Sequence, residues 1–135
     1  MAVVAVAVAL ILTGCSSNGT VEPPANDAPV TSIAYSSLSA FGTCDDLHRD
    51  TIDVASLSIV TDYTCRKPPT SESRTVAQCQ MDEFIDAIED TSYRQWRKEY
   101  VDHDILDGGG FDLLVTFADG TQLATHAMNE FPADV

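Results

Sequence analysis

The chain has 135 residues, room for one domain rather than two, and 44% of them are hydrophobic, which is ordinary for a globular protein. Lys and Arg total 7 while Asp and Glu total 21, so the net charge is −14. Phosphate contacts need clustered cations, so this excess of acids excludes nucleic-acid binding as a first expectation. It also argues against electrostatic docking on anionic membranes.

The N-terminus begins with an unbroken apolar run over residues 2–12. A helix needs about 20 apolar residues to span a bilayer, so this run is too short to cross one, but it has the length of a secretion signal's core. Residues 12–15 read Leu-Thr-Gly-Cys, which resembles the lipobox of bacterial lipoproteins. The resemblance implies a signal peptide over 1–14, which a peptidase removes, and a Cys15 that carries diacylglycerol and further acyl groups such as palmitate. Several acyl chains on one cysteine give durable anchoring.

Residues 1–14 hold no Lys or Arg, although a secretion signal normally starts with one, so a start codon further upstream is one explanation. The alternative to a leader is a buried N-terminal strand or helix with a free Cys15. With the leader, the protein is expected on the outer side of a bacterial cell membrane or in the outer membrane.

Residues 15–30 combine the lipidated cysteine with a stretch rich in Ser, Pro and Asn. Such a stretch buries too little apolar surface to offset its ordering entropy, so we expect a disordered tether. Residues 16–29 would reach roughly 20 Å as a flexible coil. The folded domain is then expected over residues 31–135.

Three cysteines remain beyond Cys15, namely Cys44, Cys65 and Cys79. Export favours a disulfide, and three thiols form one bond and leave one thiol over. A hairpin that turns near residues 54–55 places Cys44 opposite Cys65, which is the first expectation. Cys65 with Cys79 is the competing pair, and three free thiols are the third possibility. No C-x₂-C spacing occurs, so no structural zinc site is expected.

The fold class expected from the folded part is α+β, with a single small antiparallel sheet of about five or six strands and one packed helix. Alternating apolar residues predict strands at 31–38, 47–54 and 57–63. Pro68 and Pro69 end the third strand, because proline cannot donate to a ladder.

An amphipathic helix is predicted at about 75–90. Thr75 and Gln78 have the spacing of a capping box with Thr75 as N-cap. The apolar residues recur on one helical face, at Ala77, Met81, Phe84, Ile85 and Ile88. Acidic residues take the solvent side, at Asp82, Glu83, Asp86 and Glu89.

Residues 93–101 fit either a helix or a strand. In both cases Trp96 and Tyr100 are expected to pack in the core or on a sheet face. The basic residues nearby are interpreted as a solvated face; they are Arg94, Arg97 and Lys98.

The clearest hairpin covers residues 111–127, where apolar residues alternate on both sides of Asp119-Gly120. A three-residue loop with Gly120 in the left-handed region pairs Phe117 with Thr121 and Val115 with Leu123. We prefer it to a two-residue Asp-Gly loop because it keeps apolar residues together, and it sends His126 to the opposite face. Residues 107–110, Asp-Gly-Gly-Gly, are expected to form a loop.

The last third resembles uncharacterised families of bacterial exported or lipid-anchored proteins, over about residues 93–132. The residues that carry the resemblance are Trp96-x₃-Tyr100, Ile105-Leu106-Asp107-Gly108, Phe111-x-Leu113-x-Val115, Asp119-Gly120 and Asn129-x-Phe131-Pro132. The resemblance implies an antiparallel sheet with one packed helix and assigns no activity and no site.

No catalytic residue, cofactor or metal site is predicted from the residues. The histidines His48, His103 and His126 are far apart in the sequence, and the common catalytic motifs are missing. Asp102, Asp104 and Asp107 have the wrong spacing for a calcium loop. Paired acids such as Asp45-Asp46 are expected by chance in so acidic a chain.

The leading expectation is therefore a non-catalytic, membrane-anchored interaction module. One variant is an inhibitor or trap of a basic protein such as a lysozyme, because an acidic domain attracts cationic partners at low salt. Two further possibilities are a lipoprotein that binds a metal or small ligand, and an enzyme with an unrecognised site.

Overall fold

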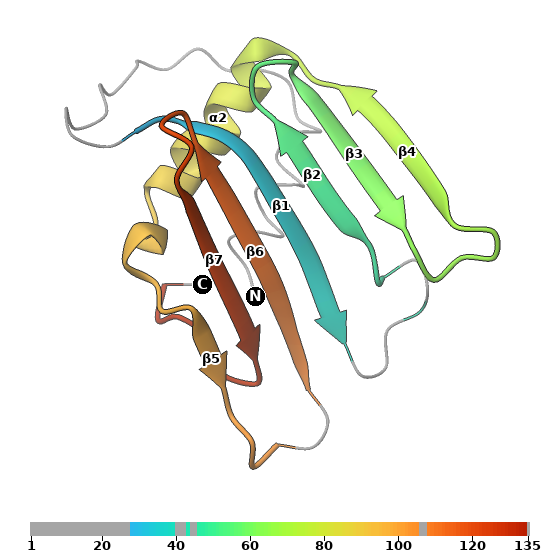
Figure 1. Cartoon of the computed structure of the whole chain (residues 1–135), viewed down its shortest axis with the longest axis vertical. Coiled ribbons are helices and arrows are strands. Elements are labelled where there is room, and N and C mark those ends of the chain that lie inside the picture. The colour runs from blue at the N-terminus through green and yellow to red at the C-terminus, as the bar shows by residue number, and fades with distance from the viewer. Residues whose placement is uncertain (1–27, 40–42, 44–45, 106–107, 135) are drawn as a thin grey trace.

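In a computed structural model, the described residues of the protein form one seven-stranded sheet with a helix against one face (Figure 1). The structure describes residues 28–39, 43, 46–105 and 108–134. The strands run in the order β4-β3-β2-β1-β6-β7-β5. The elements are β1 Val30–Ser39, β2 Arg49–Asp53, β3 Ser58–Tyr63, β4 Thr70–Thr75, α2 Gln78–Glu89, the 3₁₀ turn η1 Tyr93–Gln95, β5 Glu99–Val101, β6 Gly109–Phe117 and β7 Gln122–Met128.

Strand β1 lies in the middle of the sheet and joins the two halves of the chain. It pairs with β2 on one side and with β6 on the other, both antiparallel. Ile33 stands opposite Ile52 in β2 and Val115 in β6, and each of the three is at most 2% exposed. Side chains alternate between the faces of a strand, so this row of apolar residues makes one face of the sheet the core face.

Helix α2 covers that core face and buries Met81, Phe84 and Ile88 against it. The other face of the sheet, toward the viewer in Figure 1, is covered by no described element. None of the helices in the described part of the chain is long and apolar enough to cross a membrane.

The predicted helix start was wrong by two residues. The N-cap is Ala77, whose N–H donates to the side chain of Gln80 at 3.0 Å. Thr75 is not available as a cap because it pairs with Ser58 in the β3–β4 ladder. The chain can turn into a helix only where that ladder ends.

The α+β class is found, but the sheet has seven strands rather than five or six. Strand β4 was missed, because its sequence TSESRT has no apolar residue and all six of its residues are exposed. The sheet is also not purely antiparallel, since β5 runs parallel to β7. The ambiguous stretch 93–101 contains both forms, with η1 first and then β5.

Trp96 and Tyr100 pack against the hydrophobic core, as predicted. Trp96 contacts Phe111 of β6, with the two ring centroids 6.0 Å apart.

The register of the C-terminal hairpin is confirmed. Val115 pairs with Leu123, and the N–H of Phe117 donates to the carbonyl of Thr121 at 3.0 Å. Gly120 has a φ of 83°, the left-handed value that the three-residue loop requires. His126 pairs with Asp112 on the face away from the helix, as predicted.

The loop expected over 107–110 is wrong in its second half, since β6 already begins at Gly109. Gly110 is needed for close approach rather than for an unusual φ. A Cβ atom at Gly110 would lie 1.9 Å from the backbone oxygen of Ala127 in β7, whereas one at Gly109 would lie 3.4 Å from the oxygen of Leu38.

We therefore predict that Gly110→Ala destabilises the protein by about 2 kcal/mol, because the added methyl group pushes β6 and β7 apart. Gly109→Ala is the matched control and should change the free energy of unfolding by less than about 1 kcal/mol. Urea unfolding followed by circular dichroism measures both. Equal effects at the two positions would show that the contact with β7 is not the reason for glycine.

Candidate functional site

A small cavity of about 20 Å³ lies between the sheet and the C-terminal end of α2. Its wall is mostly apolar, with Ile33, Ile52 and Leu113 from the sheet, Phe84 and Ile88 from α2, and Trp96 from the segment after it. The cavity has room for about one water-sized group. Ligand pockets are typically about 300–1,000 Å³, so in this form it accepts no substrate-sized molecule.

One carboxylate, that of Asp50, lies on the wall of this cavity and is 7% exposed. Thr61 donates its hydroxyl to Asp50 Oδ1 at 2.6 Å, and His48 Nε2 lies 3.4 Å from Asp50 Oδ2. A buried acid usually has such partners, because an unpaired one costs several kcal/mol. Both oxygens of the Asp50 carboxylate therefore already have a partner, Thr61 for one and His48 for the other.

Tyr35 stands directly opposite Asp50 in the β1–β2 ladder and also lines the cavity. Burial raises the pKa of its hydroxyl above the ordinary value, and the negative charge of Asp50 raises it further. Its ring stacks on Phe111 with a centroid distance of 5.9 Å. Tyr35 is therefore a neutral hydroxyl at physiological pH.

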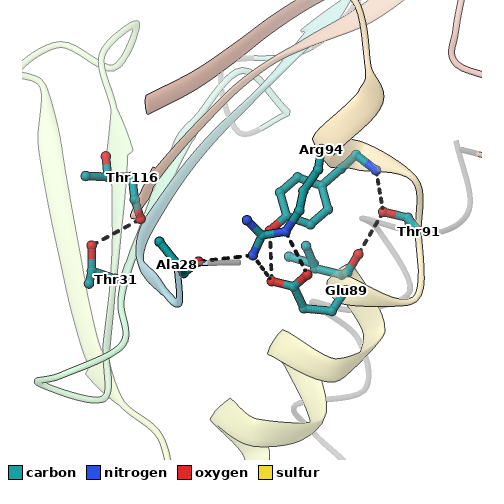
Figure 2. Close-up of polar contacts among 8 residues, drawn as sticks. Ala28, Thr31, Glu89, Thr91, Arg94 and Thr116 are labelled. Atoms are coloured by element: carbon teal, nitrogen blue, oxygen red, sulfur yellow. Dashed lines mark hydrogen bonds and ion pairs between the residues drawn. The ribbon is translucent and has the colours of Figure 1, made fainter. Parts of the chain in front are cut away.

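A second polar cluster lies where β1 enters the sheet (Figure 2). Arg94 donates to both carboxylate oxygens of Glu89, at 2.7 and 3.1 Å, and to the backbone oxygen of Ala28 at 3.2 Å. The hydroxyl of Tyr93 donates to the same Glu89 at 2.8 Å. This group, which we call the Arg94 clamp, connects the end of α2 to the start of the described chain.

The Arg94 clamp also reaches β6. The Arg94 guanidinium carbon lies 4.6 Å from the centroid of the Phe117 ring, a cation–π distance. Beside it, Thr31 donates its hydroxyl to the carbonyl of Thr116 at 3.1 Å, at the bulge in the β1–β6 ladder (Figure 2). Ala28 and Thr31 are thus each held by a hydrogen bond, Ala28 to Arg94 after α2 and Thr31 to Thr116 in β6.

The interpretation of the basic residues as a solvated face was wrong for Arg94. Its side chain is 25% exposed, whereas that of Arg97 is 62% exposed and bonds Glu130 at 2.8 Å. The spacing of the two arginines in the sequence does not reveal this difference in exposure. The difference arises because Ala28, just before β1, lies within hydrogen-bond distance of Arg94.

Of the predicted site residues, Cys15 and Cys44 lie outside the described part of the chain. Cys65 follows β3, and Cys79 is in the first turn of α2. Both Cys65 and Cys79 are disulfide-bonded, and no described cysteine is a free thiol. The pairing of Cys44 with Cys65 stays a prediction.

The three histidines do not come together. His48 is beside Asp50, His126 bonds Asp112 at 2.7 Å on the open face, and His103 is exposed. Within the described residues no group of His, Cys, Asp or Glu is arranged to hold a metal ion. Asp102 accepts the backbone N–H of Asp104, and Asp107 lies outside the described residues.

Asp50 and Arg94 were not predicted as important residues. Asp50 had a signal, since it is two positions before Ile52 and therefore on the same face of its strand.

Comparisons with protein families, curated proteins and solved structures find no match for this chain.

We predict that Arg94→Lys lowers the free energy of unfolding by about 1–2 kcal/mol, because lysine keeps the charge but cannot make the paired bonds to Glu89. Arg97→Lys is the matched control at an exposed pair and should cost less than about 0.5 kcal/mol. Both are measured by urea unfolding. A loss for Arg94→Lys no larger than the control's would contradict the structural role of the clamp.

Proposed function

We propose that the protein is an extracytoplasmic lipoprotein, anchored through an acylated Cys15, whose folded domain is a non-catalytic binding module. The anchor would hold the domain at the cell membrane or outer membrane through residues 15–30. The proposal depends on the apolar run over residues 2–12 and on the Leu-Thr-Gly-Cys sequence at residues 12–15.

The described fold bears on how such an anchor would be connected to the domain. The seven described strands, helix α2 and the described core come from residues 28–134. Strand β1 starts at Val30, which is buried, so the last residue of the expected tether already belongs to the sheet. The Arg94 clamp holds Ala28 at this boundary and would transmit the pull of a membrane anchor to α2 and β6 rather than to β1 alone.

The disulfides bear on the same proposal. Structural disulfides persist in oxidising compartments, so bonded cysteines at positions 65 and 79 agree with export. The disulfides also limit which cysteine is left to carry the lipid, because the chain has four cysteines in all. A bond between Cys65 and Cys79 leaves Cys15 for lipid. If Cys65 instead pairs with Cys44, Cys15 is the remaining partner for Cys79 within the chain, and a disulfide there excludes acylation.

Intact mass of the protein purified from the membranes of its native host tests the anchor. We expect a chain that starts at Cys15 and carries acyl groups, and reduction should add two hydrogen atoms per disulfide. Peptide mapping without reduction then assigns the partners of Cys65 and Cys79.

Two variants analysed by the same mass measurement provide the matched comparison. Cys15→Ser should abolish the acyl mass on the membrane-derived chain, while Ser16→Ala should keep it, because only the thiol accepts lipid. A wild-type chain that retains Met1 and carries no acyl group, or a Cys15–Cys79 disulfide, would overturn the proposal.

A second candidate, capture of a basic protein such as a lysozyme, is favoured by the outer face of α2. Between Gln78 and Glu89 the helix has no Lys or Arg. Its exposed acids follow one another along the outer surface, at Asp82, Glu83, Asp86, Glu89 and Asp90. Of these, Glu89 is neutralised by Arg94, and a cationic surface would be attracted to the rest.

If this candidate is right, immobilised protein retains a basic lysozyme at low salt, and Glu83→Gln with Asp86→Asn weakens retention by about tenfold. Glu99→Gln with Asp104→Asn is the control, because it removes the same charge from exposed sites away from α2. Binding is measured by surface plasmon resonance across a salt series. Equal losses for the two double variants would mean that net charge, and not this surface, attracts the bait.

A further inference from the structure

Strand β4 forms one edge of the sheet and has a neighbour, β3, on one side only among the described strands (Figure 1). All six of its residues are exposed, and it contains no proline. An edge of this kind presents unpaired N–H and C=O groups and is a template for another strand. The side chains and register of β4 identify which strand fits.

The backbone groups that are free on β4 can be assigned from the β3–β4 ladder. Val76 N–H donates to the carbonyl of Leu57 at 2.9 Å, and hydrogen-bonded pairs alternate along an antiparallel ladder. The backbone groups at positions 70, 72 and 74 therefore point toward β3. Those of Ser71, Ser73 and Thr75 point outward, to the free edge.

Two opposite charges lie between these outward residues. Glu72 and Arg74 are opposite Thr61 and Ile59 in the ladder, so both side chains lie on the helix face of the sheet. Arg74 makes no ion pair with any other residue that the structure describes. Glu72 is 65% exposed and contacts Arg66 at 3.3 Å, which leaves it accessible to a second cation.

We propose that β4 pairs with β4 of a second copy of this chain, antiparallel and about a two-fold axis at Ser73. In this register Ser73 meets Ser73 of the other copy, and Ser71 meets Thr75, so all outward backbone groups are hydrogen-bonded. Glu72 then stands opposite Arg74 of the other copy, twice, in the closer, non-hydrogen-bonded type of pair.

Charge selects this register over its neighbours. Antiparallel pairing of the outward residues allows only shifts by an even number of positions, of which a shift by two in either direction loses the least overlap. One shift puts Glu72 opposite Glu72, and the other puts Arg74 opposite Arg74, and like charges directly opposite each other are destabilising. Charged residues often protect an edge from pairing; here their order permits one self-complementary pairing.

The dimer is expected to be weak. One strand pair buries little surface, and each copy carries a net charge of −14, so the two copies repel one another over longer distances. Sedimentation equilibrium should cover about 10 µM to about 1 mM, which is the range for small interfaces. The protein used is the chain from residue 15 onward with Cys15→Ser, so that neither the apolar run over residues 2–12 nor a lipid drives association.

Charge exchange is the test. Glu72→Arg alone and Arg74→Glu alone should each weaken the dimer by at least about tenfold, because each replaces two attractions with two repulsions. A 1:1 mixture of the two single variants should dimerise again, since every Arg then faces a Glu. The double variant E72R/R74E should dimerise like the wild type.

Both residues are exposed, so the variants should unfold like the wild type in urea, which separates loss of association from loss of folding. A wild-type chain that is monomeric throughout this range, even if it binds extended peptides of other proteins, would overturn the proposal. So would single variants that dimerise as strongly as the wild type, or a mixture that stays monomeric.

Discussion

The fold depends on the burial of Ile33 between Ile52 and Val115. This contact joins the β2–β4 segment to the C-terminal hairpin. Helix α2 packs in the same hydrophobic core. Because β1 alone pairs with both halves of the sheet, neither half can bury its apolar face without it. A domain of this size with one such core is expected to unfold as one cooperative unit.

The same strand determines how the proposed anchor would meet the domain. Ala28, just before β1, is held by Arg94, and Thr31 in β1 bonds Thr116, so a membrane tether would join a part of the fold that is bonded to both α2 and β6. The acidic face of α2 and the edge strand β4 are then left exposed for partners. Apolar packing therefore decides which surfaces of this domain are free to bind.

The parts of the fold that were predicted correctly have an apolar pattern of their own. The hairpin at 111–127 has apolar residues at every second position from Phe111 to Phe117, so its register followed from keeping apolar residues together. Strand β4 has no such pattern, because it is exposed on both faces and is held by its ladder to β3. Arg94 could not be distinguished from Arg97 for a similar reason, since its partner Ala28 is far away in the sequence. The burial of Asp50 was predictable, because it is two positions before Ile52 in the same strand. It was not singled out because the chain has 21 Asp and Glu residues.

Native-state hydrogen exchange of the backbone amides tests the central role of β1 most directly. The structure predicts that the amides of β1 and of its neighbour β6 exchange slowest and at a common rate, because both open only when the whole domain unfolds. The outer strands β4 and β5 should exchange faster. If the β1 amides exchanged as fast as those of β4, or if β2 and β3 stayed protected after β1 had opened, the two halves of the sheet would be stable separately and the central role of β1 would be contradicted.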